Sequence, residues 1–416
     1  MQIGIYQSYW GRVGGGQRYV GVVAKVLARQ HRVEVIHHCP DFDAAKVAEP
    51  MELDLSRVHF RYVPRLERPS WPSANPLRRL NYERDWGRDL SAGYDLFIDS
   101  SDNVPFFCHA HHGALLIHFP LVSFEEFHGH TTASWTSRSW FKRLAGQFFH
   151  RLEWRRRFGT YPLCLVNADF TRRWIKRRWG LESVVVYPPL RGGLAPGDKA
   201  PIILTIGAFS HTHHKKHEIT LKAFRDLCDG GLSGWRYVLA GACGTDAEDQ
   251  AYVARLRAAA QGYPVEIRTN LSGRELKDLL GQASILWHSM GYGVDEQKDP
   301  GRLEHFGMVA TEAMAAGCVP IVFNGGGLPE SVTHGQTGFL WRTLEELGRY
   351  TLEAVGDEAL RETLAVAASN RAAHFSEENF AARLLAALAP VLGEDGQSLV
   401  GRDKRDEHSS LTPGVA

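Results

Sequence analysis

Hydrophobic and polar positions follow two patterns along the first 187 residues, continuous apolar runs and helical spacing. Short apolar runs, typical of buried parallel strands, occur at 3–6, 33–37, 95–98, 115–119, 163–167 and 184–187. Apolar residues three and four positions apart, such as Val20, Val23 and Leu27, indicate a helix after the first run, and further helices are predicted at 78–90, 138–158 and 169–179. Strands that alternate with helices predict a parallel, doubly wound sheet.

The same alternation starts again after a segment rich in proline and glycine. Residues 188–201 can continue neither a helix nor a central strand, so they are predicted to be a linker. Strands are then predicted at 202–206, 236–240, 265–268, 285–288 and 320–323, and helices at 218–227, 247–260, 273–280 and 308–316. The predicted fold class is α/β, with two doubly wound Rossmann-like domains that face each other across a cleft.

The domain boundaries follow from these patterns. We expect an N-terminal, acceptor-side domain at 1–187 and a C-terminal, nucleotide-sugar-binding domain at 202–375. A helix at 376–393 is expected to return to the N-terminal domain. The polar, charged segment 394–416 is predicted to be a disordered tail.

Composition narrows the setting of the protein. A hydrophobic content of 44% and a charged content of 23% are those of a soluble globular chain, and a net charge of +1 does not favour nucleic acid as a partner. Six cysteines without a Cys-x-x-Cys pair suit a reducing compartment. Without a secretory leader or a run of about 18 apolar residues, we expect a cytoplasmic location, with peripheral contact to the inner face of a membrane.

Two glutamates eight positions apart form the sharpest chemical pattern. Glu304 falls in a loop before a predicted helix, and Glu312 falls inside that helix. Gly307 lets backbone approach a ligand closely, and the helix start offers free N–H groups to phosphate. Because a carboxylate accepts two hydroxyl donors, one glutamate can hold a sugar and the other a ribose. Lys215 is a point charge able to neutralise a diphosphate leaving group.

This pattern resembles the E-x7-E signature of retaining GT-B glycosyltransferases of the GT4-like family (glycosyl transferases group 1). The resemblance extends over most of the chain, through segments 14–16, 166–172, 186–189, 204–209, 325–330 and 335–340. It includes similarity to lipid-linked oligosaccharide mannosyltransferases around His118. By this resemblance Glu304 contacts the donor sugar and Glu312 the ribose.

The resemblance also implies the rest of the site. Catalytic roles would fall to His118, Glu304 and Lys215. The donor-binding set would be Gly15, Gly16, Gly207, Lys215, Lys216, Glu304, Phe306, Gly307, Met308 and Glu312. The family usually has an arginine where this chain has Ala208, so another cation, Arg302 or Arg268, would have to compensate.

Histidines occur in two groups that could suggest a metal. They are His109, His111 and His112 in one group, and His211, His213, His214 and His217 in the other. Neither group has the helical H-E-x-x-H spacing or a supporting cysteine pair. The family needs no metal for catalysis, so we expect no metal and no cofactor besides the sugar nucleotide.

Residues 135–178 combine basic and aromatic side chains. Twelve lysines and arginines are interleaved with tryptophan and phenylalanine, and only Glu153 and Asp169 oppose them. Such a segment suits an anionic membrane surface, although a polyanionic acceptor or a solvated basic face remains open.

The expected function is transfer of a hexose such as mannose, with retention, from a nucleoside diphosphate sugar to a hydroxyl of a glycan or lipid-linked acceptor. Two alternatives stay open, a nucleotide-sugar epimerase and a non-catalytic relative that binds sugar nucleotide or lipid; Ala208 supports the latter. A dehydrogenase is disfavoured because the first glycine-rich loop lacks G-x-G-x-x-G spacing.

Overall fold

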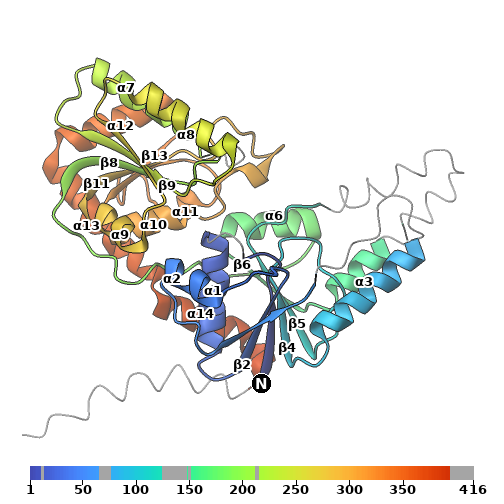
Figure 1. Ribbon diagram of the computed structural model, residues 1–416. Coiled ribbons are helices and arrows are strands. Elements are labelled where there is room, and N and C mark those ends of the chain that lie inside the picture. Colours follow the sequence, from blue (N-terminus) through green and yellow to red (C-terminus); the bar gives the residue numbers. More distant parts are fainter. Residues whose placement is uncertain (11–13, 65–75, 124–147, 149–150, 211–214, 394–416) are drawn as a thin grey trace, which may run out of the picture.

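The computed structural model describes residues 1–10, 14–64, 76–123, 148, 151–210 and 215–393, which form two α/β domains (Figure 1). The N-terminal sheet has the order β3-β2-β1-β4-β5-β6-β7, and its strands pair in parallel. Its strands are β1 (Gln2–Tyr6), β2 (Arg32–His37), β3 (Val58–Tyr62), β4 (Leu96–Asp99), β5 (His112–Ile117), β6 (Leu163–Val166) and β7 (Val184–Val185).

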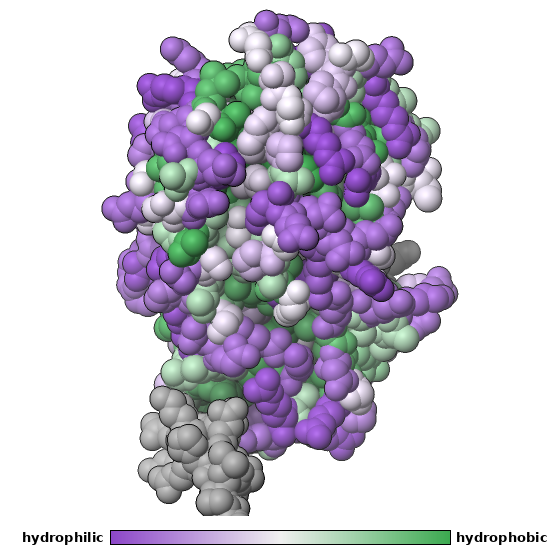
Figure 2. All heavy atoms as spheres, turned by 90° about the vertical axis from the view of Figure 1, so that its left-hand side faces the viewer, coloured by the Kyte–Doolittle hydropathy of each residue, from purple (hydrophilic) through white to green (hydrophobic). Residues whose placement is uncertain are grey.

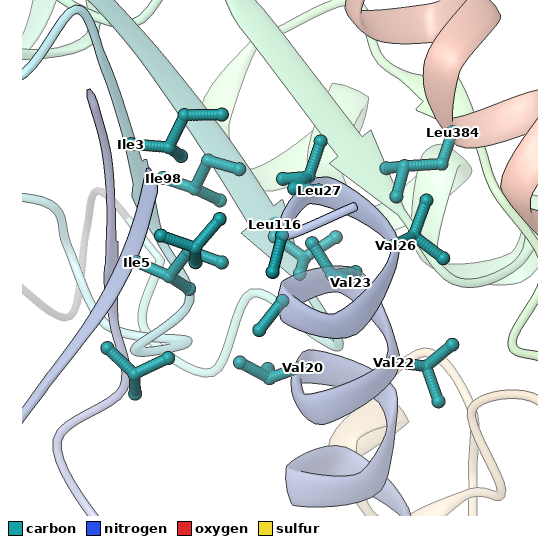
Figure 3. Packing of buried hydrophobic residues seen from close by; sticks show 14 of the residues in the cluster. Ile3, Ile5, Val20, Val22, Val23, Val26, Leu27, Ile98, Leu116 and Leu384 are labelled. Carbon is teal, nitrogen blue, oxygen red and sulfur yellow. The ribbon is translucent and has the colours of Figure 1, made fainter. Parts of the chain in front are cut away.

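Helices α1 (Gly15–Leu27), α2 (Ala44–Met51), α3 (Pro76–Ser91) and α6 (Asp169–Trp179) belong to this domain, and residues 151–158 are also helical. Figure 3 shows how the apolar side of α1 meets the sheet: Val20, Val23 and Leu27 point toward Ile5 and Ile98. These side chains are almost completely buried. Burying each contributes roughly 1.5–3 kcal/mol, which fixes α1 against the strand that precedes it.

The C-terminal domain repeats the design with a parallel sheet in the order β10-β9-β8-β11-β12-β13. Its strands are β8 (Ala200–Ile206), β9 (Arg236–Gly241), β10 (Val265–Thr269), β11 (Ala283–His288), β12 (Val319–Phe323) and β13 (Phe339–Trp341). Its helices are α7 (His217–Asp229), α8 (Ala247–Ala260), α9 (Gly273–Gln282), α10 (Met308–Ala315), α11 (Leu328–Ser331), α12 (Leu344–Gly356) and α13 (Glu358–Ala372), with short 3-10 turns η2 (Pro300–Arg302) and η3 (Ala373–Phe375).

Helix α14 (Glu377–Leu392) crosses back to the N-terminal domain and packs beside α1 (Figure 1). Phe380, Leu384 and Leu388 are buried in the N-terminal core. Where the chain passes between the domains, the N–H of Leu190 donates to the carbonyl of Phe375 at 2.7 Å. The outgoing linker and the returning segment therefore lie side by side.

The predicted fold class is confirmed, with two missed strands. The β3 sequence alternates apolar and polar residues because β3 is an edge strand, so it lacks the continuous apolar run used to find the others. The β13 strand has three residues, too few for a pattern. Of the predicted helix 138–158, residues 151–158 are helical, and residues 138–147 and 149–150 lie outside the described residues. The predicted tail at 394–416 also lies outside them.

The molecular surface is mainly polar on the face shown in Figure 2, where apolar residues gather in small, scattered groups. Within the described residues, the structure contains no helix that is both long and apolar enough to cross a bilayer.

Candidate active site

Both sheets have a topological switch point where the strand order reverses, between β1 and β4 and between β8 and β11. In open α/β sheets, ligands bind beyond the carboxyl ends of the strands at such points. The glycine loop before α1 follows β1, Lys215 follows β8, and His288 ends β11. The predicted site residues therefore gather where this fold offers binding sites.

The N-termini of α1 and α10 face each other across the domain boundary. A Cβ added at Gly15, the first residue of α1, would lie 3.1 Å from the Sδ of Met308, the first residue of α10. Gly307 precedes α10 with a φ of 91°, a left-handed conformation that favours glycine. Two helix starts bring unpaired N–H groups and two positive dipole ends to one place, which suits a diphosphate.

Glu304 is held by two cationic or hydrogen-bonding partners. The Nζ of Lys215 donates to Glu304 Oε2 at 2.8 Å, and the Nε2 of His288 lies 3.1 Å from the same oxygen. Burial acts to raise the pKa of Glu304, but the charge of Lys215 and the hydrogen bond from His288 together hold it well below its usual range. Glu304 is therefore ionised at neutral pH and can accept hydrogen bonds from sugar hydroxyls.

Glycines determine how closely the surrounding loops approach this pair. A Cβ at Gly207 would lie 2.9 Å from the Cγ of Lys215, so the missing side chain lets Lys215 lie across the end of β8. Cβ atoms at Gly326 and Gly327 would come within 2.1 Å and 2.0 Å of the carbonyl oxygens of Glu304 and His305. The 325–327 loop thus supports the Glu304 backbone directly.

Glu312 lies on α10 in a buried cluster of charges, and its side chain is 8% exposed. The Nε of Arg191, in the linker, is 3.8 Å from Glu312 Oε1, and Arg191 also pairs with Glu52 at 3.7 Å. Burial raises the pKa of Glu312, and the charges of Arg191 and Arg18 oppose this rise. Arg18 itself donates to the carbonyls of Pro189 and Leu190.

The other predicted residues are placed in different ways. His118 follows β5 and faces Gly16, where an added Cβ would lie 3.4 Å from its Nε2. Phe306 is buried against Tyr187 and Phe375, so only its main chain is free for a donor. Lys216 is half-buried and caps α7 in a left-handed conformation.

The two arginines expected to replace the family cation have acidic partners. Arg268 donates to Glu266 at 2.7 Å on the edge strand β10, and Arg302 pairs with Asp299 at 3.3 Å. Lys215 is thus the cation that contacts Glu304 among the predicted residues, and Arg18 and Arg191 surround Glu312.

The structure describes part of the histidine groups. His211, His213 and His214 lie outside the described residues, and His217 is buried against Phe209 and Tyr252. Among the described residues, no group of three or more His, Cys, Asp or Glu could hold a metal ion. The expectation of metal-free catalysis stays a prediction.

An apolar cluster and an interdomain cap join the two domains beside the site. Phe119 stacks on His305 with ring centroids 4.4 Å apart, and Phe170 and Phe306 belong to the same cluster. The Glu330 carboxylate of α11 accepts from the N–H groups of Asp169 and Phe170 at 2.7 Å each. A C-terminal-domain acid therefore caps the first turn of α6 in the N-terminal domain.

Sequence reasoning missed four residues with close contacts here: Asp102, His288, Arg191 and Arg18. The end-of-strand rule could have found His288, which closes the predicted strand 285–288. Asp102 and the two arginines left no signal, because their partners are far away in the sequence.

Comparison with known families gives two matches that overlap at residues 188–190. Residues 13–190 match the family described as Glycosyltransferase Family 4, and residues 188–371 match the family described as Glycosyl transferases group 1.

The chain is also similar to proteins named GDP-Man:Man(3)GlcNAc(2)-PP-Dol alpha-1,2-mannosyltransferase. The protein from Dictyostelium discoideum is 24% identical, over 95% of this chain and 85% of its own. Those from Xenopus laevis and Mus musculus are 29% and 28% identical over 55% of this chain, which spans about half of their length.

Solved structures share the fold. Anabaena HepE in complex with UDP and glucose has a TM-score of 0.64 at 16% identity, covering 93% of this chain and 99% of that one. A glycosyltransferase from Rickettsia africae has a TM-score of 0.63 at 16% identity, covering 94% and 99%.

Proposed function

Since this chain belongs to the GT-B glycosyltransferases, with a family 4 N-terminal half and a group 1 C-terminal half, we propose that it transfers mannose from GDP-mannose to a hydroxyl of a lipid-linked glycan, with retention at the anomeric carbon. The activity for which its relatives are named supports the donor and the acceptor class. One observation carries the proposal: the starts of α1 and α10 meet beside the Lys215–Glu304 pair.

In the proposed mechanism the donor diphosphate lies at the two helix starts. Negative charge grows on the diphosphate as the sugar departs, and Lys215 together with the helix N-termini stabilises it. Ionised Glu304 accepts hydrogen bonds from the sugar hydroxyls, and Glu312 accepts from the ribose diol. The acceptor approaches from the N-terminal domain, and contact between the domains excludes water that would hydrolyse the donor.

We also propose that the protein works at an anionic membrane surface. Exposed basic residues lie on two adjoining helices, which pack together through Phe158 and Trp179 with ring centroids 5.1 Å apart. The basic face consists of Arg151, Arg155, Arg156, Arg172, Arg173, Lys176 and Arg177, with exposed Phe148 and Leu152. Cationic and apolar groups together favour anionic lipid. Residues 135–147 and 149–150 of the basic segment lie outside the described residues. The cytoplasmic location stays a prediction.

Ligand-induced stabilisation tests the proposed donor. GDP-mannose, UDP-glucose, UDP-GlcNAc, UDP-galactose and the free nucleotides are compared by thermal shift and calorimetry. A donor present at about 100 times its Kd stabilises the protein by about 2.7 kcal/mol. We expect GDP-mannose and GDP to raise the Tm, and the uridine nucleotides to leave it unchanged.

The Glu312→Ala variant supplies the internal control, because it removes the ribose partner. We expect its Kd for GDP to rise by at least about 10-fold, the effect of roughly 1.4 kcal/mol lost with one charged hydrogen-bonded pair. A uridine nucleotide as the stabilising ligand would overturn the choice of donor. No stabilisation by any sugar nucleotide would overturn the proposed function, and an unchanged Kd in the variant would overturn the role of Glu312.

A further inference from the structure

His118 is held from one side by Asp102, a residue of the loop after β4. The two carboxylate oxygens of Asp102 lie 3.2 Å and 3.1 Å from His118 Nδ1. One of them also accepts from the backbone N–H of His118 at 2.6 Å. On the other side, Thr171 Oγ1 donates to the carbonyl of His118 at 3.0 Å. Both the main chain and the ring of His118 are therefore fixed.

The Asp102 backbone is built for this contact. Its φ of 56° is in the left-handed region, which costs on the order of 1 kcal/mol for a residue with a side chain. Asp and Asn tolerate this region better than other residues. The carboxylate that results accepts from the N–H groups of two consecutive residues, His118 and Phe119, as well as from the imidazole.

The opposite edge of the imidazole faces the first turn of α1. Its Nε2 is the atom nearest to Gly16, and the neighbouring Gly15 faces Met308 at the start of α10. Tyr19 contacts the ring edge-on, with centroids 5.5 Å apart. Nδ1 is thus occupied by Asp102, while Nε2 is buried and lies against Gly16 in the first turn of α1.

The charges around the ring favour its protonated form. Burial acts to lower the pKa of His118, but the charge and hydrogen bond of Asp102, with the Gly16 backbone, outweigh it and raise the pKa. Tyr19 is neutral, because burial raises its pKa. Burial is the main cause that lowers the pKa of His305 in the C-terminal domain, and the charge of His118 lowers it further, which favours an uncharged His305. Asp102 is then the charged group that determines the state of His118.

We propose that Asp102 is a positioning residue for the transfer reaction: it fixes His118 as an imidazolium whose Nε2–H donates to an oxygen of the bound sugar nucleotide. His118 then acts as a fixed positive hydrogen-bond donor and not as a base, and no proton is transferred. The proposal rests on the proposed function for its ligand, but the Asp102–His118 arrangement exists without a ligand. The two can therefore fail separately.

Nitrogen NMR of the imidazoles in the ligand-free protein tests the arrangement directly, with the His118 signals assigned by their absence in His118→Gln. We expect both ring nitrogens of His118 to carry protons at pH 7 in the wild type. Asp102→Asn keeps a residue suited to the left-handed backbone. In this variant the His118 ring should lose its second proton at a lower pH than in the wild type. The matched control is Asp43→Asn, which changes the same group in the cap of α2 and should leave His118 unchanged.

A pH profile of turnover tests the consequence. Activity that needs the imidazolium falls as pH rises through the pKa of His118, so Asp102→Asn should move this fall to lower pH. At pH 7.5 we expect its kcat to drop by about 10-fold or more, because a fixed positive hydrogen-bond donor is lost from the reacting ligand. A neutral His118 at pH 7 in the wild type, or an identical titration in Asp102→Asn, would overturn the proposal even if GDP-mannose binds. If no sugar nucleotide binds while the NMR titration behaves as expected, the proposed function fails and the Asp102–His118 pairing stands.

Discussion

Glu304 is contacted by side chains that reach it from two strands, Lys215 from the loop after β8 and His288 from the end of β11. The sequence could identify Glu304 and Lys215, because each falls in a segment with a recognisable pattern. It could not pair them with His288, because that contact requires β8 and β11 to be neighbours in the sheet. The sequence pattern of a single segment does not predict the order of the strands. Residue types were predictable at this scale, and contacts were not.

Glycine roles show the same limit. The 325–327 loop was recognised as part of a family motif, but its steric reason is the close approach to the backbone of Glu304 and His305. A sequence motif identifies the positions of the glycines but not their steric role. The packing in the structure is needed to show which atoms a side chain at a glycine position would displace.

A buried histidine predicts how stability depends on pH. Burial, aided by the charge of Lys215, lowers the pKa of His217 to about 3, whereas an unfolded chain has a histidine pKa of about 6.5. Below about pH 6.5 the unfolded chain binds a proton that the folded protein does not, so stability is complete above that pH and decreases from there toward pH 3. At pH 5 the loss is about 2 kcal/mol. Between pH 7 and pH 5, we expect the free energy of unfolding of His217→Gln to fall by about 2 kcal/mol less than that of the wild type. Denaturant unfolding at the two pH values measures the difference.

The exposed His374 supplies the comparison for this measurement. His374→Gln should lose as much stability as the wild type over the same pH interval. If His217→Gln also does so, His217 is not a buried neutral group.

At the scale of elements, strands with continuous apolar runs and helices with regular spacing were predictable to within a few residues, and α8 and α6 were predicted with their observed bounds. Edge and short elements were not, because β3 alternates apolar and polar residues at the edge of its sheet and β13 has three residues. Helices α2, α11, α12 and α13 were also missed. Helix α2 has eight residues and contains Pro50, and α11 has four residues. Helices α12 and α13, with 13 and 15 residues, were missed despite their length.

The helical segment 151–158 owes its position to a buried ion pair. Arg157 Nη2 donates to Glu153 at 2.6 Å and pairs with Glu83 of α3, while its Nη1 donates to the carbonyl of Pro105 at 3.0 Å. A single buried guanidinium thus fixes this segment to two others. Arg151, Arg155 and Arg156 are left on the exposed side.

This arrangement predicts how the basic face binds membranes. Each basic residue near an anionic surface contributes about 1 kcal/mol, so Arg151→Gln, Arg155→Gln and Arg156→Gln combined should weaken binding to phosphatidylserine vesicles by about 100-fold. Co-sedimentation with vesicles of stated phosphatidylserine content measures the change, and neutral vesicles give the baseline.

The control removes the same charge from the other domain. Lys222, Arg255 and Arg257 are exposed on α7 and α8, and their combined change to glutamine should leave vesicle binding unaltered. Equal losses in both triple variants would mean that net charge, and not the basic face, drives binding.

At the scale of the whole molecule, the domains meet through the Phe119–His305 stack and the Glu330 cap of α6. Burial raises the pKa of Glu330, and the N–H groups of Asp169 and Phe170 oppose the rise. A negative charge at a helix start contributes about 0.5–2 kcal/mol. This energy is available only while the domains are in contact.

Glu330→Gln should therefore shift the ligand-free protein toward separated domains. We expect small-angle X-ray scattering to give a larger radius of gyration than the wild type, and saturating donor to reverse the change. Glu345→Gln, an acid in the first turn of α12 within one domain, should leave the scattering curve unaltered. A Glu330→Gln curve that matches the wild type would show that the cap does not govern domain contact.

The double passage of the chain between the domains limits how they can move. The linker leaves near Leu190, the chain returns near Phe375, and the hydrogen bond between them holds the two passages together. Two chain segments side by side permit the domains to rotate about the line that joins the segments, but they resist twisting of one domain against the other. We therefore expect the α1–α10 contact to open and close along one path, which would bring the two helix starts back to the same register.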